Sequence, residues 1–99
     1  MELMTVRMYQ QGREIVVAAC DKDQLGKVLR EGELKLEVAR NFYEGEDCDE
    51  VMLVNRLEMA SVANLVGEKV CAVAAKHQFI SEDCVIRIAG VPHAQMVRW

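Results

Sequence analysis

The sequence predicts an α+β fold: a mostly antiparallel sheet, made of an N-terminal hairpin and C-terminal strands, is packed on one face by two helices. Three observations lead to this prediction. Strand-like runs occupy both ends of the chain, helix-type spacing of apolar residues occupies its middle, and the order of strands, then helices, then strand differs from a repeating βαβ plan. At 99 residues, the chain is expected to form a single globular domain over residues 1–99.

The N-terminal hairpin is predicted from two strand-like runs, residues 5–9 and 13–20, on either side of Gln11 and Gly12. In the first run, Val6 and Met8 alternate with polar side chains. The second run contains IVVAA at residues 15–19, which is apolar on both faces. Such a run predicts a central strand that is covered on each side or paired deep within the sheet.

The following segment is predicted to consist of short elements. Residues 21–25 form a helical turn that Gly26 ends, and residues 27–30 and 34–38 are extended on either side of a turn at Glu31 and Gly32. An irregular connection is the alternative for the two extended runs. Residues 39–43 form a helical turn that packs Phe42 and Tyr43, and the polar residues 44–48 form a loop.

Two helices are predicted between Cys48 and His77. Asp47 and Glu50 resemble a capping box, and an apolar face follows them at Leu53, Val54, Leu57 and Ala60. A second helix is predicted to start at Ser61 or Asn64, because an apolar stripe continues through Val62, Val66, Val70, Val73 and Ala74.

Gly67 falls early in this second predicted helix, where an exposed glycine costs about 1 kcal/mol relative to alanine. Two explanations are compatible with a glycine at this position. One is close packing against a strand. The other is approach of an anionic ligand to the free N–H groups at a helix N-terminus.

The C-terminal run VIRIA at residues 85–89 predicts a strand with Ile86 and Ile88 on one face. Gly90 and Pro92 are predicted to end this strand in a rigid turn. Such a turn would hold His93 and Gln95 in defined directions, which favours a recognition site. Ordinary turn chemistry, with His93 as a structural hydrogen-bonding group, is the alternative.

Composition limits the classes of function. Hydrophobic residues at 52% and charged residues at 28% are typical of a globular protein. Apolar stretches are far shorter than the roughly 20 residues of a membrane span, and the N-terminus lacks the plan of a signal peptide, so we expect a cytoplasmic protein. The net charge of −4 argues against indiscriminate binding to phosphate backbones. Acids concentrate in residues 21–50, and none follows Asp83.

No cofactor and no metal site is expected from the sequence. The four cysteines form no C-x-x-C pair, so a structural zinc site is not predicted, and reduced thiols in the core are expected instead. The chain contains no P-loop, no G-x-S-x-G and no H-E-x-x-H pattern. These residues therefore identify no reaction and no ligand.

Three segments carry a resemblance to a known family: REGELKLEVARNFYEGE at residues 30–46, ANLVGEKV at residues 63–70 and IRIAGVPHAQ at residues 86–95. With the N-terminal hairpin, they resemble the archaeal family catalogued as domain of unknown function 424 over nearly the whole chain. NLVGE and GVPHAQ are the most specific parts. The resemblance implies a small archaeal cytosolic domain without known catalytic residues, and it favours a role near translation components.

Three hypotheses follow for function. In the first, the chain is a binding or adaptor module that contacts a translation-related protein or a structured RNA. In the second, it is a small enzyme with His93 as acid or base, Glu68 as its orienting carboxylate and a helix N-terminus that binds an anionic group. In the third, it is a structural or oligomerising domain. The first hypothesis assigns a single surface to Asn64, Gly67, Glu68, Pro92, His93 and Gln95.

Overall fold

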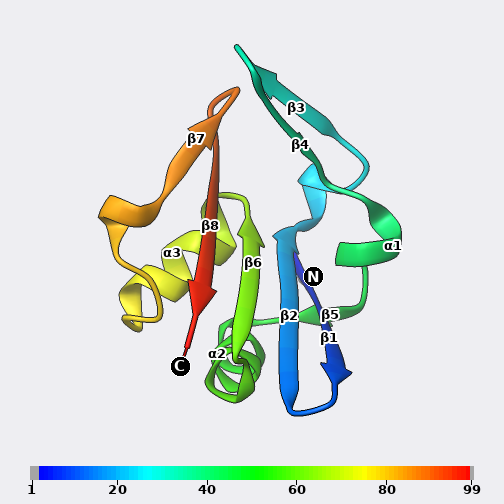
Figure 1. Ribbon diagram of the computed structural model, residues 1–99, viewed down its shortest axis with the longest axis vertical. Helices are drawn as coiled ribbons and strands as arrows, with labels where there is room; N and C mark the ends of the chain where they lie inside the picture. The colour runs from blue at the N-terminus through cyan, green and yellow to red at the C-terminus, as the bar shows by residue number, and fades with distance from the viewer. Residues whose placement is uncertain (1–2, 99) are drawn as a thin grey trace.

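The computed structural model describes residues 3–98 and has an α+β fold, as predicted (Figure 1). Its main sheet has six strands in the order β5-β1-β2-β6-β8-β7. All neighbouring strands are antiparallel except β2 and β6, which are parallel. The strands are β1 (Met4–Gln11), β2 (Glu14–Asp21), β5 (Glu46–Cys48), β6 (Val62–Val66), β7 (Ile86–Ile88) and β8 (Val91–Val97).

Both faces of the sheet carry a hydrophobic core. On the helical face, side chains of the central strands pack against α2 (Glu50–Met59) and α3 (Glu68–Lys76). On the opposite face, which we call the hairpin face, a smaller core lies beneath α1 (Arg40–Tyr43) and the hairpin of β3 (Val28–Glu31) and β4 (Leu34–Glu37). None of the helices in the described chain has the length and apolar composition needed to cross a bilayer.

The N-terminal hairpin and the central strand are confirmed. β1 and β2 pair from Met4↔Asp21 to Gln11↔Glu14, and Gly12 in the turn has φ +59°. β2 lies between β1 and β6, and the four residues before Asp21 are fully buried. Their side chains alternate between the two cores, which explains why this run is apolar on both faces.

Most of the short elements after β2 are also confirmed. A 3-10 turn covers Lys22–Gln24, β3 and β4 form a hairpin, and α1 buries Tyr43. The prediction of a loop over residues 44–48 is wrong in part, because Glu46–Cys48 forms the edge strand β5 beside β1. The cap of α2 is Asp49 rather than Asp47, since the Met52 N–H donates to Asp49 Oδ1 at 2.8 Å.

The predicted start of the second helix at Ser61 or Asn64 is wrong. Residues Val62–Val66 form β6, and α3 begins at Glu68. The valines of β6 fall by coincidence on the same helical stripe as Val70 and Val73. Strand geometry fits better here because Leu65 and Val66 are buried in opposite cores.

The predicted turn near the C-terminus lies at Ala89 and Gly90, and Pro92 is part of β8 rather than of the turn. Strand β6 ends opposite His93, so Pro92 faces Gly67, whose N–H donates to the Pro92 carbonyl at 2.9 Å. Pro92 has no N–H to donate back to the Gly67 carbonyl, but that carbonyl accepts the Cys71 N–H at 3.2 Å, so it is not left without a partner. His93 and Gln95, predicted to follow a turn, lie within a strand.

Candidate functional site

The six predicted surface residues lie on both sides of the sheet. Neighbouring residues of a strand point to opposite faces, so Pro92, Ala94 and Met96 face the helices, whereas His93 and Gln95 lie on the hairpin face. The prediction of a single surface is therefore wrong: Glu68, at the start of α3, shares a cleft with Pro92 but not with His93. The physical reason is strand alternation, which divides residues that a turn would have kept together.

Three of the predicted residues do lie together on the hairpin face. Asn64 of β6 is directly opposite Gln95 of β8, and His93 is two residues from Gln95 on the same face. Together we call them the polar triad. The Gln95 Nε2 group donates to Asn64 Oδ1 at 2.8 Å. This bond fixes both amides, and among residues 3–98 the Asn64 N–H₂ group and Gln95 Oε1 have no other hydrogen-bond partner.

The ring of His93 is also fixed in orientation. Its Nδ1 atom lies 3.0 Å from the Leu65 carbonyl oxygen, which can only accept a hydrogen bond. Nδ1 therefore carries the proton, and in the neutral ring Nε2 is an acceptor. Within residues 3–98, no protein group bonds to this nitrogen. The triad thus presents one fixed donor group and two fixed acceptors.

On the hairpin face, the three strands around the triad, β6, β7 and β8, carry no charged side chain. Every side chain that these strands place on the hairpin face is apolar or belongs to the triad. Ile86 is 47% exposed and Val97 is 52% exposed, whereas Ile88 is buried near the β3–β4 hairpin. The hairpin therefore lies near β7 at one end of these strands (Figure 1). In the triad, Gln95 is exposed, and Asn64 and His93 are half-buried.

Gly67 and the N-terminus of α3 have a structural partner within the chain. The carboxylate of Asp21, which is only 3% exposed, accepts the N–H groups of Lys69 at 2.9 Å and Val70 at 3.0 Å. Burial raises the pKa of Asp21, and these two hydrogen bonds oppose that rise. The predicted anion position at the helix N-terminus is therefore filled by the chain's own carboxylate.

The backbone of Gly67 explains why a glycine is required. Its φ is +121°, and a Cβ at this position would lie 2.7 Å from both Cβ and Oδ1 of Asp21 and closer still to Asp21 Cγ. Of the two explanations considered for Gly67, the geometry supports close packing against a strand, since Asp21 is the last residue of β2.

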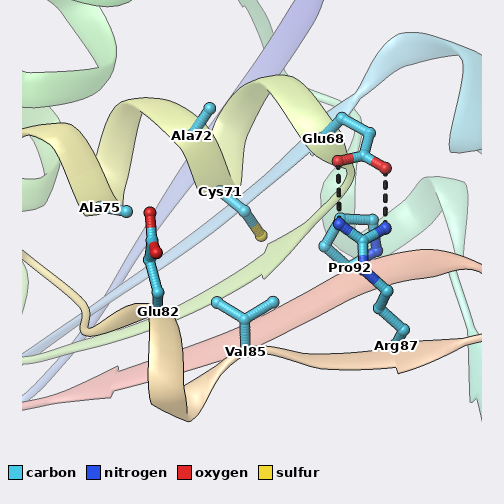
Figure 2. A pocket seen from close by; sticks show the side chains of 8 residues that line it. All are labelled: Glu68, Cys71, Ala72, Ala75, Glu82, Val85, Arg87 and Pro92. Atoms are coloured by element: carbon cyan, nitrogen blue, oxygen red, sulfur yellow. Dashed lines mark hydrogen bonds and ion pairs between the residues drawn. The ribbon is translucent and has the colours of Figure 1, made fainter.

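Glu68 and Pro92 line a cleft of about 370 Å³ between α3 and β7 (Figure 2). The Arg87 guanidinium binds both carboxylate oxygens of Glu68, at 2.8 and 3.4 Å, and donates to the Gly90 carbonyl at 3.0 Å. This pairing lowers the pKa of Glu68 and raises that of Arg87. Both side chains are largely exposed, so the ion pair itself contributes little to stability.

The geometry does not support the acid–base hypothesis. Glu68 is held by Arg87 on the helical side of the sheet, while His93 is on the hairpin face, so the two side chains cannot share a substrate. Cys71 lines the cleft as well, but burial raises the pKa of its thiol to about 12, which disfavours a thiolate nucleophile. No group of three or more metal-ligating side chains is present in residues 3–98.

Comparison with known proteins identifies the family. Residues 9–99 match the family model described as "Protein of unknown function (DUF424)". The chain belongs to the DUF424 family. A crystal structure of an uncharacterized conserved protein from Methanopyrus kandleri has the same fold as this DUF424 chain, with a TM-score of 0.79 and 25% identity over 97% of this chain and 94% of that one. No curated protein matches the chain.

Two residues that define these sites were missed in the sequence. The sequence predicts Asp21 only as the start of a helical turn and Arg87 only as part of a strand. The sequence does contain a signal for Asp21, because a glycine beside a helix start, here Gly67, indicates the close approach of another group. Nothing in the sequence pairs Arg87 with Glu68, since 19 positions separate them.

Proposed function

We propose that this DUF424 chain is a cytoplasmic binding or adaptor domain, and that it binds a protein partner through the polar triad and the apolar side chains around it. The observation that carries the proposal is the fixed orientation of three hydrogen-bonding side chains, of which Gln95 is exposed and Asn64 and His93 are half-buried. Groups held in place before binding lose little conformational entropy when a partner arrives. Ile86 and Val97 supply adjacent apolar area.

A protein partner suits this surface better than a structured RNA. RNA binding depends on basic groups for the phosphates and commonly on exposed aromatic rings for the bases. The strands around the triad carry no basic side chain on this face. On β1, Tyr9 already stacks on Phe42, with ring centroids 5.3 Å apart, and its hydroxyl donates to the Phe42 carbonyl at 2.7 Å. That ring is therefore engaged within the protein.

We further propose that the partner is a translation-related protein of an archaeal cell, as the family resemblance suggests. The test is affinity capture from an archaeal lysate with the tagged chain, followed by mass spectrometry. The variants are His93→Ala and Asn64→Ala, which each remove one member of the triad. His77→Ala is the matched control, since it removes an exposed imidazole at the end of α3, where His77 contacts Glu50.

The expected result is enrichment of a translation factor or of ribosomal particles by the parent and by His77→Ala, and loss of that enrichment in both triad variants. Nuclease treatment of the lysate separates the two partner classes. If nuclease abolishes capture, the partner is RNA and the protein proposal is replaced. If neither class of translation component is enriched, or if His93→Ala captures it as well as the parent does, the proposal is wrong.

A structural or oligomerising role is the competing function. Strand β7 pairs only with Val91–His93 in the ladder, so the rest of β8 lies at a sheet edge, and an open edge can pair with another chain. Light scattering over a range of concentrations measures this directly. A mass that stays at that of one chain, 11.2 kDa, argues against self-association.

A further inference from the structure

The cleft between α3 and β7 has apolar walls. Ala72 and Ala75 of α3 form one wall, and Val85 and Pro92 form the other, with the Cys71 sulfur between them (Figure 2). These four side chains suit a hydrocarbon chain, because none of them carries a hydrogen-bonding group. The volume of about 370 Å³ is large enough for one long side chain and part of the backbone that carries it.

The two ends of the cleft differ in charge. At one end, Glu68 is neutralised by Arg87. At the other end, the side chain of Glu82 rises beside Ala75 from the turn Glu82–Cys84 (Figure 2). No cation in the described part of the chain pairs with Glu82. The lining therefore carries two carboxylates and one guanidinium, and the uncompensated negative charge lies at the Glu82 end.

We infer that this cleft binds the basic side chain of a protein partner, with its methylene groups between the apolar walls and its cationic head at Glu82. Lysine and arginine combine an apolar stem with a charged tip, and this combination matches the cleft. A single free carboxylate matches one positive charge, which favours a side chain over a diamine carrying two. This site lies on the helical side of the sheet, so the inference goes beyond the proposed function of the triad.

The test uses small probes and nuclear magnetic resonance titration of the labelled chain. The probe is Nα-acetyl-lysine methylamide. Nα-acetyl-norleucine methylamide has a similar hydrocarbon stem without the ammonium group, and cadaverine provides a free diamine. We expect the lysine probe to shift the amide signals of Ala72, Ala75 and Val85, and to bind more tightly than either of the other two compounds.

Two charge-matched variants locate the cationic head. Glu82→Gln removes the free carboxylate and is expected to weaken binding of the lysine probe about fivefold, the upper range for one exposed ion pair. Asp83→Asn removes the same charge from the next residue, which does not line the cleft, and is expected to leave binding unchanged. Because Glu82 and Asp83 are both exposed, we expect both variants to fold.

Four outcomes overturn the inference: equal binding of the norleucine probe, equal or tighter binding of cadaverine, equal effects of the two variants, and signal shifts that lie outside the cleft. The triad is not involved in this titration. Failure here therefore leaves the proposed function standing, and failure of the lysate capture leaves the cleft result standing.

Discussion

Replacing Gly67 with alanine tests whether the contact with Asp21 governs the start of α3. The new Cβ would lie 2.7 Å from two atoms of Asp21, and the backbone would have to keep a φ of +121°. Backbone strain of this kind costs roughly 1–3 kcal/mol, and overpacking a filled site costs a further 1–3 kcal/mol or so. The sum, roughly 2–6 kcal/mol, is large beside the 5–15 kcal/mol or so that holds a typical domain folded.

The assay is urea unfolding followed by circular dichroism, with Gly12→Ala as the control. Gly12 also has positive φ, +59°, but a Cβ there meets no atom within 4 Å, so its substitution is expected to cost only about 1–2 kcal/mol. In a domain of this size, each kcal/mol of lost stability lowers Tm by roughly 4 °C or more. The lower end of the expected cost, roughly 2 kcal/mol, therefore predicts that Gly67→Ala lowers Tm by about 8 °C or more in thermal melts.

A double-mutant cycle with Asp21→Gly separates the cost of backbone strain at Gly67 from the cost of the collision with Asp21. In that background, the side chain that collides with the new Cβ is absent, so the cost of Gly67→Ala is expected to fall by about 1–3 kcal/mol while the backbone strain remains. If the two substitutions are additive, or if Gly67→Ala costs no more than Gly12→Ala, the contact with Asp21 does not explain the glycine.

Three further predictions concern other contacts. Asp21→Ala removes the acceptor at the N-terminus of α3 and is expected to lower the free energy of unfolding by about 1–2 kcal/mol in urea. The hydrogen bond from His77, followed by that from Lys76, lowers the pKa of Glu50 from its ordinary value of 4.5. The stability advantage of the parent over Glu50→Gln is therefore expected above pH 4.5 and should vanish in melts as the pH falls through the lowered value. Ellman's reagent is expected to react rapidly with the exposed Cys84 alone in the folded chain and with all four thiols in guanidinium, because the other three are buried: Cys20, Cys48 and Cys71.

The elements that the sequence predicts well are those whose signal is local. The hairpin of β1 and β2 follows from a turn at Gly12 between two extended runs, and the burial of β2 on both faces follows from its unbroken apolar run. The helix α2 follows from an acidic cap and a repeating apolar face, even though the capping residue was misplaced by two positions.

The error at β6 has a different origin. Over five residues, a strand that is buried on both faces and a helix that presents one apolar stripe can contain the same apolar residues. Only the neighbouring strands decide between them. β6 is inserted between β2 and β8, and the pairing with β2 involves residues 46 positions away, as in the bonds between Ile15 and Ser61. A local pattern does not contain that information.

The sequence predicts only part of the grouping of the candidate site residues, because that grouping also depends on strand pairing. Asn64, His93 and Gln95 were selected as hydrogen-bonding residues in the two most specific segments, and the sheet places them together. The sequence predicts Glu68 beside them, because its apolar pattern places Gly67 inside a helix that continues from Asn64. In the structure, β6 is a strand that ends before Gly67, and Glu68 therefore lies on the other side of the sheet from His93.

The parallel pairing of β2 and β6 has a consequence for how the chain folds. It is the single join between two three-stranded halves of the described sheet, β5-β1-β2 and β6-β8-β7. The β1–β2 and β7–β8 hairpins on either side pair residues that are near in sequence, whereas this join pairs residues far apart in sequence and therefore carries a larger loop-closure cost in folding. The bonds from Lys69 and Val70 to Asp21 cross the same join over 48 and 49 positions. The buried carboxylate therefore stabilises the one join of the described sheet that no short hairpin closes.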